Sequence, residues 1–363
     1  MEARIFAIEE RLKPVVPGPV GAANFRLRDE GPFNEQRLLS DPNFSLYCLD
    51  FENHHAYFTE TPGDCDLSRV PFMYQTQYQL STHMVRISFD TFHQLASEVK
   101  YDASNLLLIY SVGRCGSTLV SRALNEVEGV DSLSEPDAFT QLLPNRGSEG
   151  LSSDERAALL KSCTALQCAP GLARGKDTWA LKFRSDVTHL APLFYAILPQ
   201  AKLVFLYRNA EPWARSNWRY AQVAFPGIAG TSVDAPRPDW NGSTMLESMA
   251  MRWLGPMQTC LELQQRGIQI FIARYEELNS QPNEVLNAMF AHCGVSSCRI
   301  GDLDTVLAQD AQEGTVLSRA SLATAPTQLS ADNLTALRKK IEELAPGISA
   351  DFVIPGTYIP EAL

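Results

Sequence analysis

The sequence predicts an α/β protein with a three-layer α/β/α arrangement around a mainly parallel sheet, plus a small N-terminal β-rich lobe. From Asn105 onward, short apolar runs alternate with helix-like periodicity, which is the order expected of βα units. Before that point, short alternating segments follow one another. The chain has 363 residues, of which 45% are hydrophobic, so it is long enough to bury a large core. We therefore divide it into residues 1–104, a core at 105–300, and a C-terminal loop, helix and tail at 301–363.

The N-terminal region is expected to be rich in strands. Apolar segments on either side of residues 52–55 predict a hairpin. Aromatic and polar residues alternate in Phe72–Leu80, which indicates another strand, as does His83–Phe89. Thr91–Val99 predicts a short helix. This region either covers a ligand site of the core or forms a dimer surface, and the sequence leaves both open.

A glycine-bearing loop follows the first strand of the predicted core. The apolar run Leu106–Tyr110 leads into SVGRCGST and then into a helix-like pattern. Glycines let the backbone approach a ligand, and the following helix directs free N–H groups at an anion. An arginine and two hydroxyls add further donors. The residues predicted to cradle a phosphate or sulfate are Gly113, Arg114, Cys115, Gly116, Ser117 and Thr118.

The loop differs from the nucleoside triphosphate loop GxxxxGK[ST]. No lysine precedes Ser117, and that lysine serves β/γ-phosphate chemistry. A nucleotide-dependent kinase of a small molecule therefore remains an alternative that lacks one of its expected groups.

Two later segments carry charged and polar residues at the ends of predicted strands. Strand-like runs end at Lys182 and at Tyr207, and Arg208 follows the second of them, eight positions before Ser216. The segment FIARYEE then carries Tyr275. In this order and spacing, residues 105–295 resemble the sulfotransferases that use 3′-phosphoadenosine 5′-phosphosulfate and share the α/β fold of P-loop type.

The resemblance implies a role for each motif residue. Arg208 and Ser216 would clamp the 3′-phosphate, while the glycine loop would hold the 5′-phosphosulfate. Arg114 and Lys182 would stabilise charge on the transferred group, so both are predicted catalytic residues. Tyr275 matches a family tyrosine near the adenine. A late loop resembles a phosphate-contacting segment, in which the candidates are Ser318 and Arg319.

The general base departs from the family pattern. Arg184 stands where many members have a histidine, and an arginine cannot accept a proton. Glu135, which lies near the end of the expected next strand, is the predicted base, with Asp137 as the alternative. Glu135 could instead be an acidic residue near a helix N-terminus.

Charge and composition restrict the partners. The net charge is −11, so we expect no nucleic-acid partner and no polyanionic acceptor. A neutral or cationic small molecule fits best. No apolar run approaches the roughly 20 residues of a membrane span, and the first 20 residues lack the core of a secretory signal. The eight cysteines are interpreted as reduced thiols of a cytoplasmic protein. No metal is expected, and a homodimer is left open.

These observations predict a sulfotransferase that moves a sulfuryl group from 3′-phosphoadenosine 5′-phosphosulfate to a hydroxyl of a small acceptor, in line and without a metal. The second alternative, besides the kinase, is a non-catalytic nucleotide-binding scaffold on the same fold. The acceptor is not encoded in any motif we can read.

Overall fold

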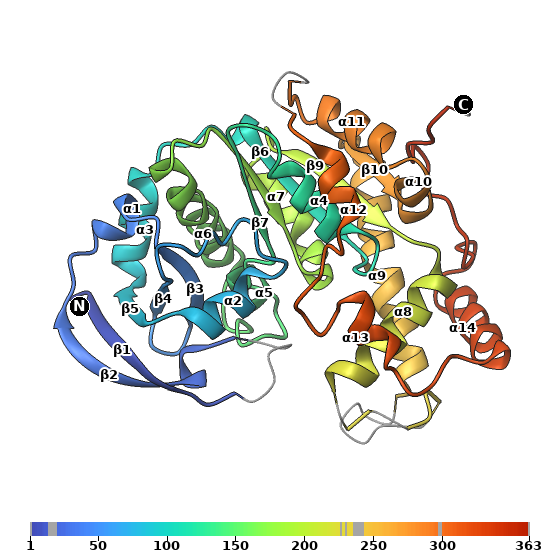
Figure 1. The fold of residues 1–363 in the computed structure, drawn as a ribbon, viewed down its shortest axis with the longest axis horizontal. Coiled ribbons are helices and arrows are strands. Elements are labelled where there is room, and N and C mark those ends of the chain that lie inside the picture. The colour runs from blue at the N-terminus through green and yellow to red at the C-terminus, as the bar shows by residue number, and fades with distance from the viewer. Residues whose placement is uncertain are drawn as a thin grey trace. The chain divides into compact units, whose positions relative to one another are not determined.

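The chain folds into two compact units, each described here by itself (Figure 1). A computed structural model describes residues 2–13, 20–225, 227–228, 231–234, 243–296 and 300–361. The first unit comprises Met1–Leu108, Leu124–Lys202 and Cys298–Gly301. The second comprises Ile109–Ala123, Leu203–Ser297 and Asp302–Leu363.

An antiparallel sheet of five strands occupies the N-terminal part of the first unit, with strand order β2-β1-β5-β4-β3. The predicted hairpin is confirmed as β3 and β4, which pair antiparallel from Phe44↔Glu60 to Asp50↔His55. Strands β1 and β2 were not predicted, and their residues are half-buried or exposed along most of their length. The bounds are β1 (Arg4–Arg11), β2 (Phe25–Pro32), β3 (Phe44–Asp50), β4 (His55–Glu60) and β5 (His83–Ser88).

The strand expected at Phe72–Leu80 is wrong, because Met73–Leu80 form helix α2. Tyr74 and Tyr78 are four residues apart, so in a helix they share one face, and both are buried. The aromatic residues at alternate positions 72 and 74 suggested an extended chain. However, Phe72 is extended and precedes the first turn of the helix, so the alternation spans a boundary.

The remaining elements of the first unit position the ends of two parallel strands, β7 (Val130–Ser134) and β8 (Thr178–Lys182). The longest helix of this unit, α6 (Ser153–Ala173), begins with a capping box in which Ser152 and Glu155 satisfy each other's backbone N–H groups. The shorter elements are η1 (Ala22–Asn24), α1 (Arg37–Ser40), α3 (Phe89–Glu98), η2 (Ala103–Asn105), α5 (Ala138–Gln141), η3 (Ser185–Leu190) and α7 (Ala191–Ile197).

The second sheet has the strand order β10-β9-β6-β8-β7, and its pairs β7–β8 and β9–β10 are parallel. Strand β6 (Leu106–Ser111) is fully buried, and the division between the two units falls within it. In the second unit, β9 (Lys202–Tyr207) pairs with β10 (Ile270–Arg274) from Leu203↔Ile270 to Tyr207↔Arg274. The α/β class with a separate β-rich lobe is therefore confirmed.

Helices complete the second unit. Helix α4 (Ser117–Leu124) follows the glycine loop, α8 (Ala210–Ala224) follows β9, and α9 (Met245–Gln265) begins with a Thr244–Glu247 capping box. The others are α10 (Tyr275–Ser280), α11 (Pro282–His292), α12 (Leu303–Ala308), α13 (Arg319–Ala323) and α14 (Ala331–Leu344). The glycine- and proline-rich segment 225–239 lies partly outside the described residues. No helix in the described ranges is long and apolar enough to cross a membrane.

Candidate functional site

The glycine loop is held by buried hydrogen bonds within the second unit. Val112 N–H donates to the Leu206 carbonyl at 3.1 Å, and the Trp213 indole donates to the Val112 carbonyl at 3.0 Å. These bonds fix the point where β6 ends. The chain then turns through positive φ at Gly113 (74°) and Gly116 (82°) before α4 begins.

Gly116 cannot be replaced without displacing its neighbours. A Cβ at this position would lie 2.9 Å from Leu278 Cδ2 and 3.2 Å from Tyr275 Cδ2. Its left-handed backbone also disfavours other residues. The loop therefore lies directly against the start of α10. The hydroxyl residues Ser117 and Thr118 begin α4 and are buried, so the first turn of that helix combines backbone N–H groups with two hydroxyls.

The side chain of Arg114 reaches two other segments of the second unit. Its Nε donates to Ser216 Oγ at 3.0 Å, and its Nη1 donates to Gln312 Oε1 at 2.7 Å. The Gln312 side-chain amide is also 3.4 Å from Thr118 Oγ1, to which it donates. Arg114 itself has φ of 52°, a left-handed conformation that is uncommon for a residue with a side chain.

Arg208 lies in the same cluster. Its guanidinium carbon is 4.3 Å from the centroid of the Tyr275 ring, and its Nη1 donates to the Arg114 carbonyl at 3.4 Å. The Arg208 carbonyl accepts from the Trp253 indole at 2.8 Å, which fixes the backbone at the end of β9. Its Nε is buried and has no hydrogen-bond acceptor among the described residues. A stacked guanidinium with an unused donor is suited to an anion.

Cys115 turns its side chain inward. The thiol is fully buried and donates to the Leu206 carbonyl at 3.3 Å. Only the backbone of Cys115 remains available for a ligand, so its predicted contact with a cofactor reduces to a main-chain one. Of the described cysteines, all but Cys65 are buried, while Cys298 lies outside the described residues.

The residues of the late loop make different contacts. Ser318 caps α13 by accepting from Ser321 N–H, and Arg319 is exposed with its own N–H bound to Asp310 Oδ2 at 2.7 Å. It is Gln312, seven residues before Arg319, that contacts the loop residue Arg114. The sequence reasoning selected the late segment but not this glutamine, because no motif distinguishes it.

In the first unit, two ion pairs form at the ends of β7 and β8. The parallel register pairs Ser134 with Lys182, and Glu135 N–H donates to the Lys182 carbonyl at 2.7 Å. This register brings Lys182 Nζ to 2.6 Å from Glu135 Oε1, with side-chain exposures of 3% and 16%. Glu135 also has a left-handed backbone, with φ of 59°.

The second pair repeats the first at a spacing of two residues. Arg184 Nη1 donates to Asp137 Oδ1 at 2.8 Å, and the other carboxylate oxygen of Asp137 is buried without a partner among the described residues. Each cation lies over an aromatic ring from the start of α2, Lys182 over Phe72 at 5.6 Å and Arg184 over Tyr74 at 4.9 Å. We call these four charged residues and two rings the charge ladder.

The electrostatics of the charge ladder keep its arginine charged. Burial by itself would lower the pKa of Arg184, but the nearby charges of Asp137 and Glu135 and the Tyr74 hydroxyl hold that pKa above its usual value. Burial raises the pKa of Tyr74. Arg184 therefore cannot take the place of the family histidine as a base, and the carboxylates remain the candidates in this unit.

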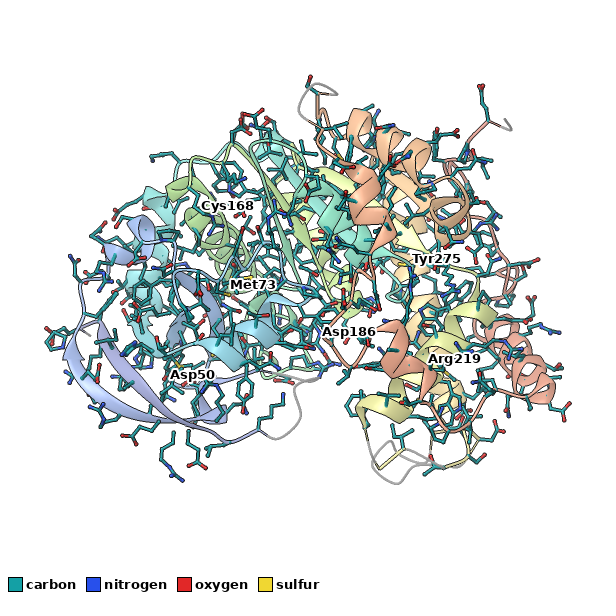
Figure 2. All side chains as sticks on the ribbon, in the orientation of Figure 1. Asp50, Met73, Cys168, Asp186, Arg219 and Tyr275 are labelled. Atoms are coloured by element: carbon teal, nitrogen blue, oxygen red, sulfur yellow. The ribbon has the colours of Figure 1, made fainter. Side chains whose placement is uncertain are left out.

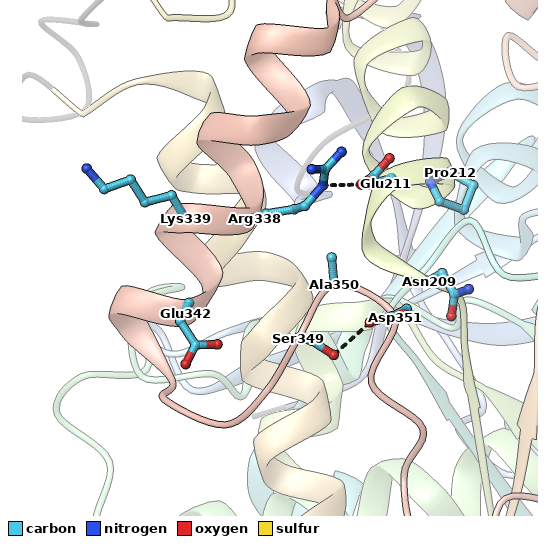
Figure 3. A pocket seen from close by; sticks show the side chains of 9 residues that line it. All are labelled: Asn209, Glu211, Pro212, Arg338, Lys339, Glu342, Ser349, Ala350 and Asp351. Atoms are coloured by element: carbon cyan, nitrogen blue, oxygen red, sulfur yellow. Dashed lines mark hydrogen bonds and ion pairs between the residues drawn. The ribbon is translucent and has the colours of Figure 1, made fainter.

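A separate pocket of about 590 Å³ lies in the second unit, between α8, α14 and the segment around Ser349 (Figure 3). Two contacts join residues that line it: Arg338 pairs with Glu211, and the Ser349 hydroxyl donates to Asp351. Lys339 extends away from that pair in Figure 3. Asn209 lines the pocket, but none of the predicted site residues does. In the part of the chain that the structure describes, no group of three or more His, Cys, Asp and Glu residues is arranged to hold a metal ion.

Comparisons with known proteins give structural matches only. No protein-family model and no curated protein matches the chain. A sulfotransferase structure from Alicyclobacillus acidocaldarius is 16% identical, over 66% of this chain and 94% of its own, with a TM-score of 0.41. One from Mycobacterium avium is 13% identical over 70% and 79%, with a TM-score of 0.44, and one from Mycobacterium tuberculosis is 13% identical over 69% and 79%, with a TM-score of 0.39. The solved structures that the chain is similar to here are thus sulfotransferases.

Proposed function

We propose that this protein is a sulfotransferase that transfers a sulfuryl group from 3′-phosphoadenosine 5′-phosphosulfate to a hydroxyl of a small molecule. The observation that carries the proposal is the cluster around the glycine loop. It joins Arg114, Arg208 and Ser216 to a buried turn of α4 that bears two hydroxyls. Two guanidinium groups beside a helix N-terminus are complementary to a nucleotide with two separate phosphate groups.

The two ends of the donor would use different parts of this cluster. The backbone N–H groups of the loop, with the Ser117 and Thr118 hydroxyls, would hold the 5′-phosphosulfate. Arg208 and Ser216 would hold the 3′-phosphate. Tyr275 stacks under Arg208 and fixes the plane of the guanidinium, which supports the assignment of a planar, bidentate contact.

The chemistry needs positioning and charge stabilisation more than covalent help. The sulfur forms a bond to the acceptor oxygen while its bond to the 5′-phosphate oxygen breaks. The leaving group is 3′-phosphoadenosine 5′-phosphate, and the acceptor proton passes to a base. Lys182 would stabilise the negative charge that develops on the bridging oxygen.

Glu135 is the proposed base. The assignment rests on the sequence resemblance and is supported by two features of the residue itself. As a carboxylate it can accept a proton, and its strained backbone conformation is of the kind that concentrates at functional positions. Among non-glycine residues in the described ranges, positive φ occurs at His54, Arg114 and Glu135, and two of these three are predicted site residues.

The experiment is calorimetric titration of 3′-phosphoadenosine 5′-phosphate, beside ATP with Mg²⁺, into wild type, Arg208→Ala and Arg219→Ala. Arg219 is on α8, eleven residues after Arg208, and binds Gln328 at the surface, so it is a control for the loss of one positive charge. Figure 2 labels Arg219 and Tyr275, the ring on which Arg208 stacks. We expect tight binding of the bisphosphate that weakens at least about 10-fold in Arg208→Ala only.

Two results would contradict the proposal. A preference for ATP with Mg²⁺ would favour the kinase alternative. The other result is a wild type that binds the bisphosphate yet turns over no acceptor in a broad screen of hydroxyl compounds, with Glu135→Gln leaving the binding unchanged. That result would favour the non-catalytic scaffold.

A further inference from the structure

We propose that Arg114 reads the 3′-phosphate of the donor, together with Arg208 and Ser216, rather than the sulfuryl group that is transferred, and that Gln312 is the residue that positions it. This inference rests on the proposed function and names the determinant of its nucleotide specificity. The loop position alone suggests the opposite, because Arg114 lies between the two glycines that would cradle the phosphosulfate.

The direction of the Arg114 side chain favours the 3′-phosphate as its ligand. Its Nε donates to Ser216 Oγ at 3.0 Å, and Ser216 is the hydroxyl assigned to the 3′-phosphate. Arg208, the other group of that clamp, is tied to the Arg114 carbonyl through its Nη1. Arg114 is therefore bonded to both groups, to Ser216 through its side chain and to Arg208 through its carbonyl, although the three residues come from the loop, from the end of β9 and from α8.

Two of the groups bonded to Arg114, the Ser216 hydroxyl and the Gln312 carboxamide oxygen, are weaker acceptors than a phosphate. A hydroxyl and a carboxamide oxygen are both neutral, whereas hydrogen bonds to an ionised oxygen are shorter and about twice as strong. A phosphate placed beside Ser216 would therefore draw the Arg114 guanidinium toward itself. The buried Nε of Arg208 adds a donor that has no acceptor among the described residues. Two guanidinium groups then balance the double charge of a phosphate monoester.

Gln312 is held in place by a short segment that is fastened to α4. Its backbone N–H donates to Asp310 Oδ1 at 3.0 Å, and Arg122 of α4 donates to the Asp310 carbonyl at 3.1 Å. From this support, the Gln312 carboxamide accepts from Arg114 and donates to Thr118 Oγ1. It thus fixes Arg114 on one side and orients a hydroxyl of the 5′ site on the other.

The assignment predicts which nucleotides are rejected. If Arg114 and Arg208 both bind the 3′-phosphate, a nucleotide without that group forgoes charge-assisted hydrogen bonds to two guanidinium groups. Adenosine 5′-phosphosulfate and ATP would then bind poorly even though the glycine loop could take their 5′-phosphate groups.

The test measures the contributions of the 3′- and 5′-phosphate groups separately. Binding of 3′-phosphoadenosine 5′-phosphate, adenosine 5′-phosphate and adenosine 3′-phosphate is measured by calorimetry on wild type, Arg114→Met and Thr118→Val. We expect Arg114→Met to weaken the bisphosphate and the 3′-phosphate about 10- to 100-fold and the 5′-phosphate less than about 3-fold. Thr118→Val should give the reverse pattern, with the 5′-phosphate affected and the 3′-phosphate spared.

Gln312→Ala and Gln309→Ala test the positioning role. Both remove a carboxamide from the same segment, and Gln309 binds Arg122 instead of Arg114. We expect Gln312→Ala to weaken the 3′-phosphate ligands about 3- to 10-fold at an unchanged melting temperature, and Gln309→Ala to leave them unchanged. Adenosine 5′-phosphate should weaken less in Gln312→Ala, because the contact of Gln312 with Thr118 is 3.4 Å long and the one with Arg114 is 2.7 Å. A merely structural role would lower the melting temperature and weaken all three ligands alike.

The outcomes separate this inference from the proposed function. A loss of 5′-phosphate binding in Arg114→Met as large as the loss for the bisphosphate would overturn the reassignment of Arg114 and leave the donor site intact. Wild-type protein that binds none of the three nucleotides would overturn the proposed function, and the inference with it.

Discussion

The buried pair of Lys182 and Glu135 allows a prediction that separates stability from chemistry. The three variants are Lys182→Met, Glu135→Gln and the double variant. Lys182 is 3% exposed and its Nζ is 2.6 Å from the carboxylate of Glu135, so neither charge is well solvated when its partner is removed. Removing one partner of a buried ion pair typically costs about 3–5 kcal/mol, whereas replacing both is often close to neutral.

The structure indicates the loss of stability expected of each variant relative to that range. Lys182→Met leaves a carboxylate that keeps 16% exposure, which favours the lower end, about 3 kcal/mol. Glu135→Gln should cost about 2 kcal/mol, because a carboxamide oxygen still accepts from the ammonium, which also lies over the Phe72 ring. The double variant should lie within about 2 kcal/mol of wild type, so the coupling is about 3 kcal/mol.

Urea unfolding of the full chain measures these differences as changes in midpoint at constant slope. The control cycle uses Arg28 and Glu9 on the first sheet, which form an ion pair at 58% and 44% exposure and should couple by less than about 1 kcal/mol. Additive effects of Lys182→Met and Glu135→Gln would refute the reasoning. In parallel, kcat of Glu135→Gln should fall about 10²- to 10⁴-fold with unchanged affinity for 3′-phosphoadenosine 5′-phosphate, as loss of a general base requires.

Three further outcomes follow from the packing of particular residues. Gly116→Ala should weaken bisphosphate binding about 10-fold or more in calorimetry, because its Cβ would displace the Tyr275 ring at 3.2 Å and strain a left-handed backbone; an unchanged affinity would contradict this. Gly171→Ala should destabilise the fold by about 1–3 kcal/mol in urea, since its Cβ would lie 2.5 Å from Asp131 Oδ2 and 2.8 Å from Trp179 Nε1. Burial raises the pKa of Asp131, so the folded state binds its proton more tightly than the unfolded state does. Its contribution to stability should therefore fall as pH rises from about 4 through its folded pKa. The free energy of unfolding of wild type relative to Asp131→Asn, measured between about pH 3 and 7, should fall in the same way. A difference that stays flat or rises would exclude this.

Local patterns were sufficient for the elements that surround the loop. Strands β6 and β9 are continuous apolar runs, and each is followed by a helix whose apolar residues recur at helical spacing. Such elements are specified by residues close together in the sequence, so a single segment carries the signal. The predicted hairpin at β3 and β4 is of the same kind.

The misassigned segment shows the limit of that approach. The rings of Phe72 and Tyr74 alternate, as in a strand, but they lie at the start of α2 and cover Lys182 and Arg184. The two rings are two residues apart, as are the two cations and the two carboxylates of the charge ladder. The match therefore depends on three segments that are far apart in the sequence. No window of the sequence contains that information.

The sequence by itself determined the α/β class, the glycine loop and the paired spacing of Arg208 and Ser216, because each is written in adjacent or periodic residues. Only the tertiary structure decided where the arginine of the loop points, that Gln312 holds it, and that Glu135 pairs with Lys182 at the ends of two parallel strands. Those contacts join residues 47 to 198 positions apart. Their geometry depends on strand register and on the direction of individual side chains, which the order of residues along a segment does not specify.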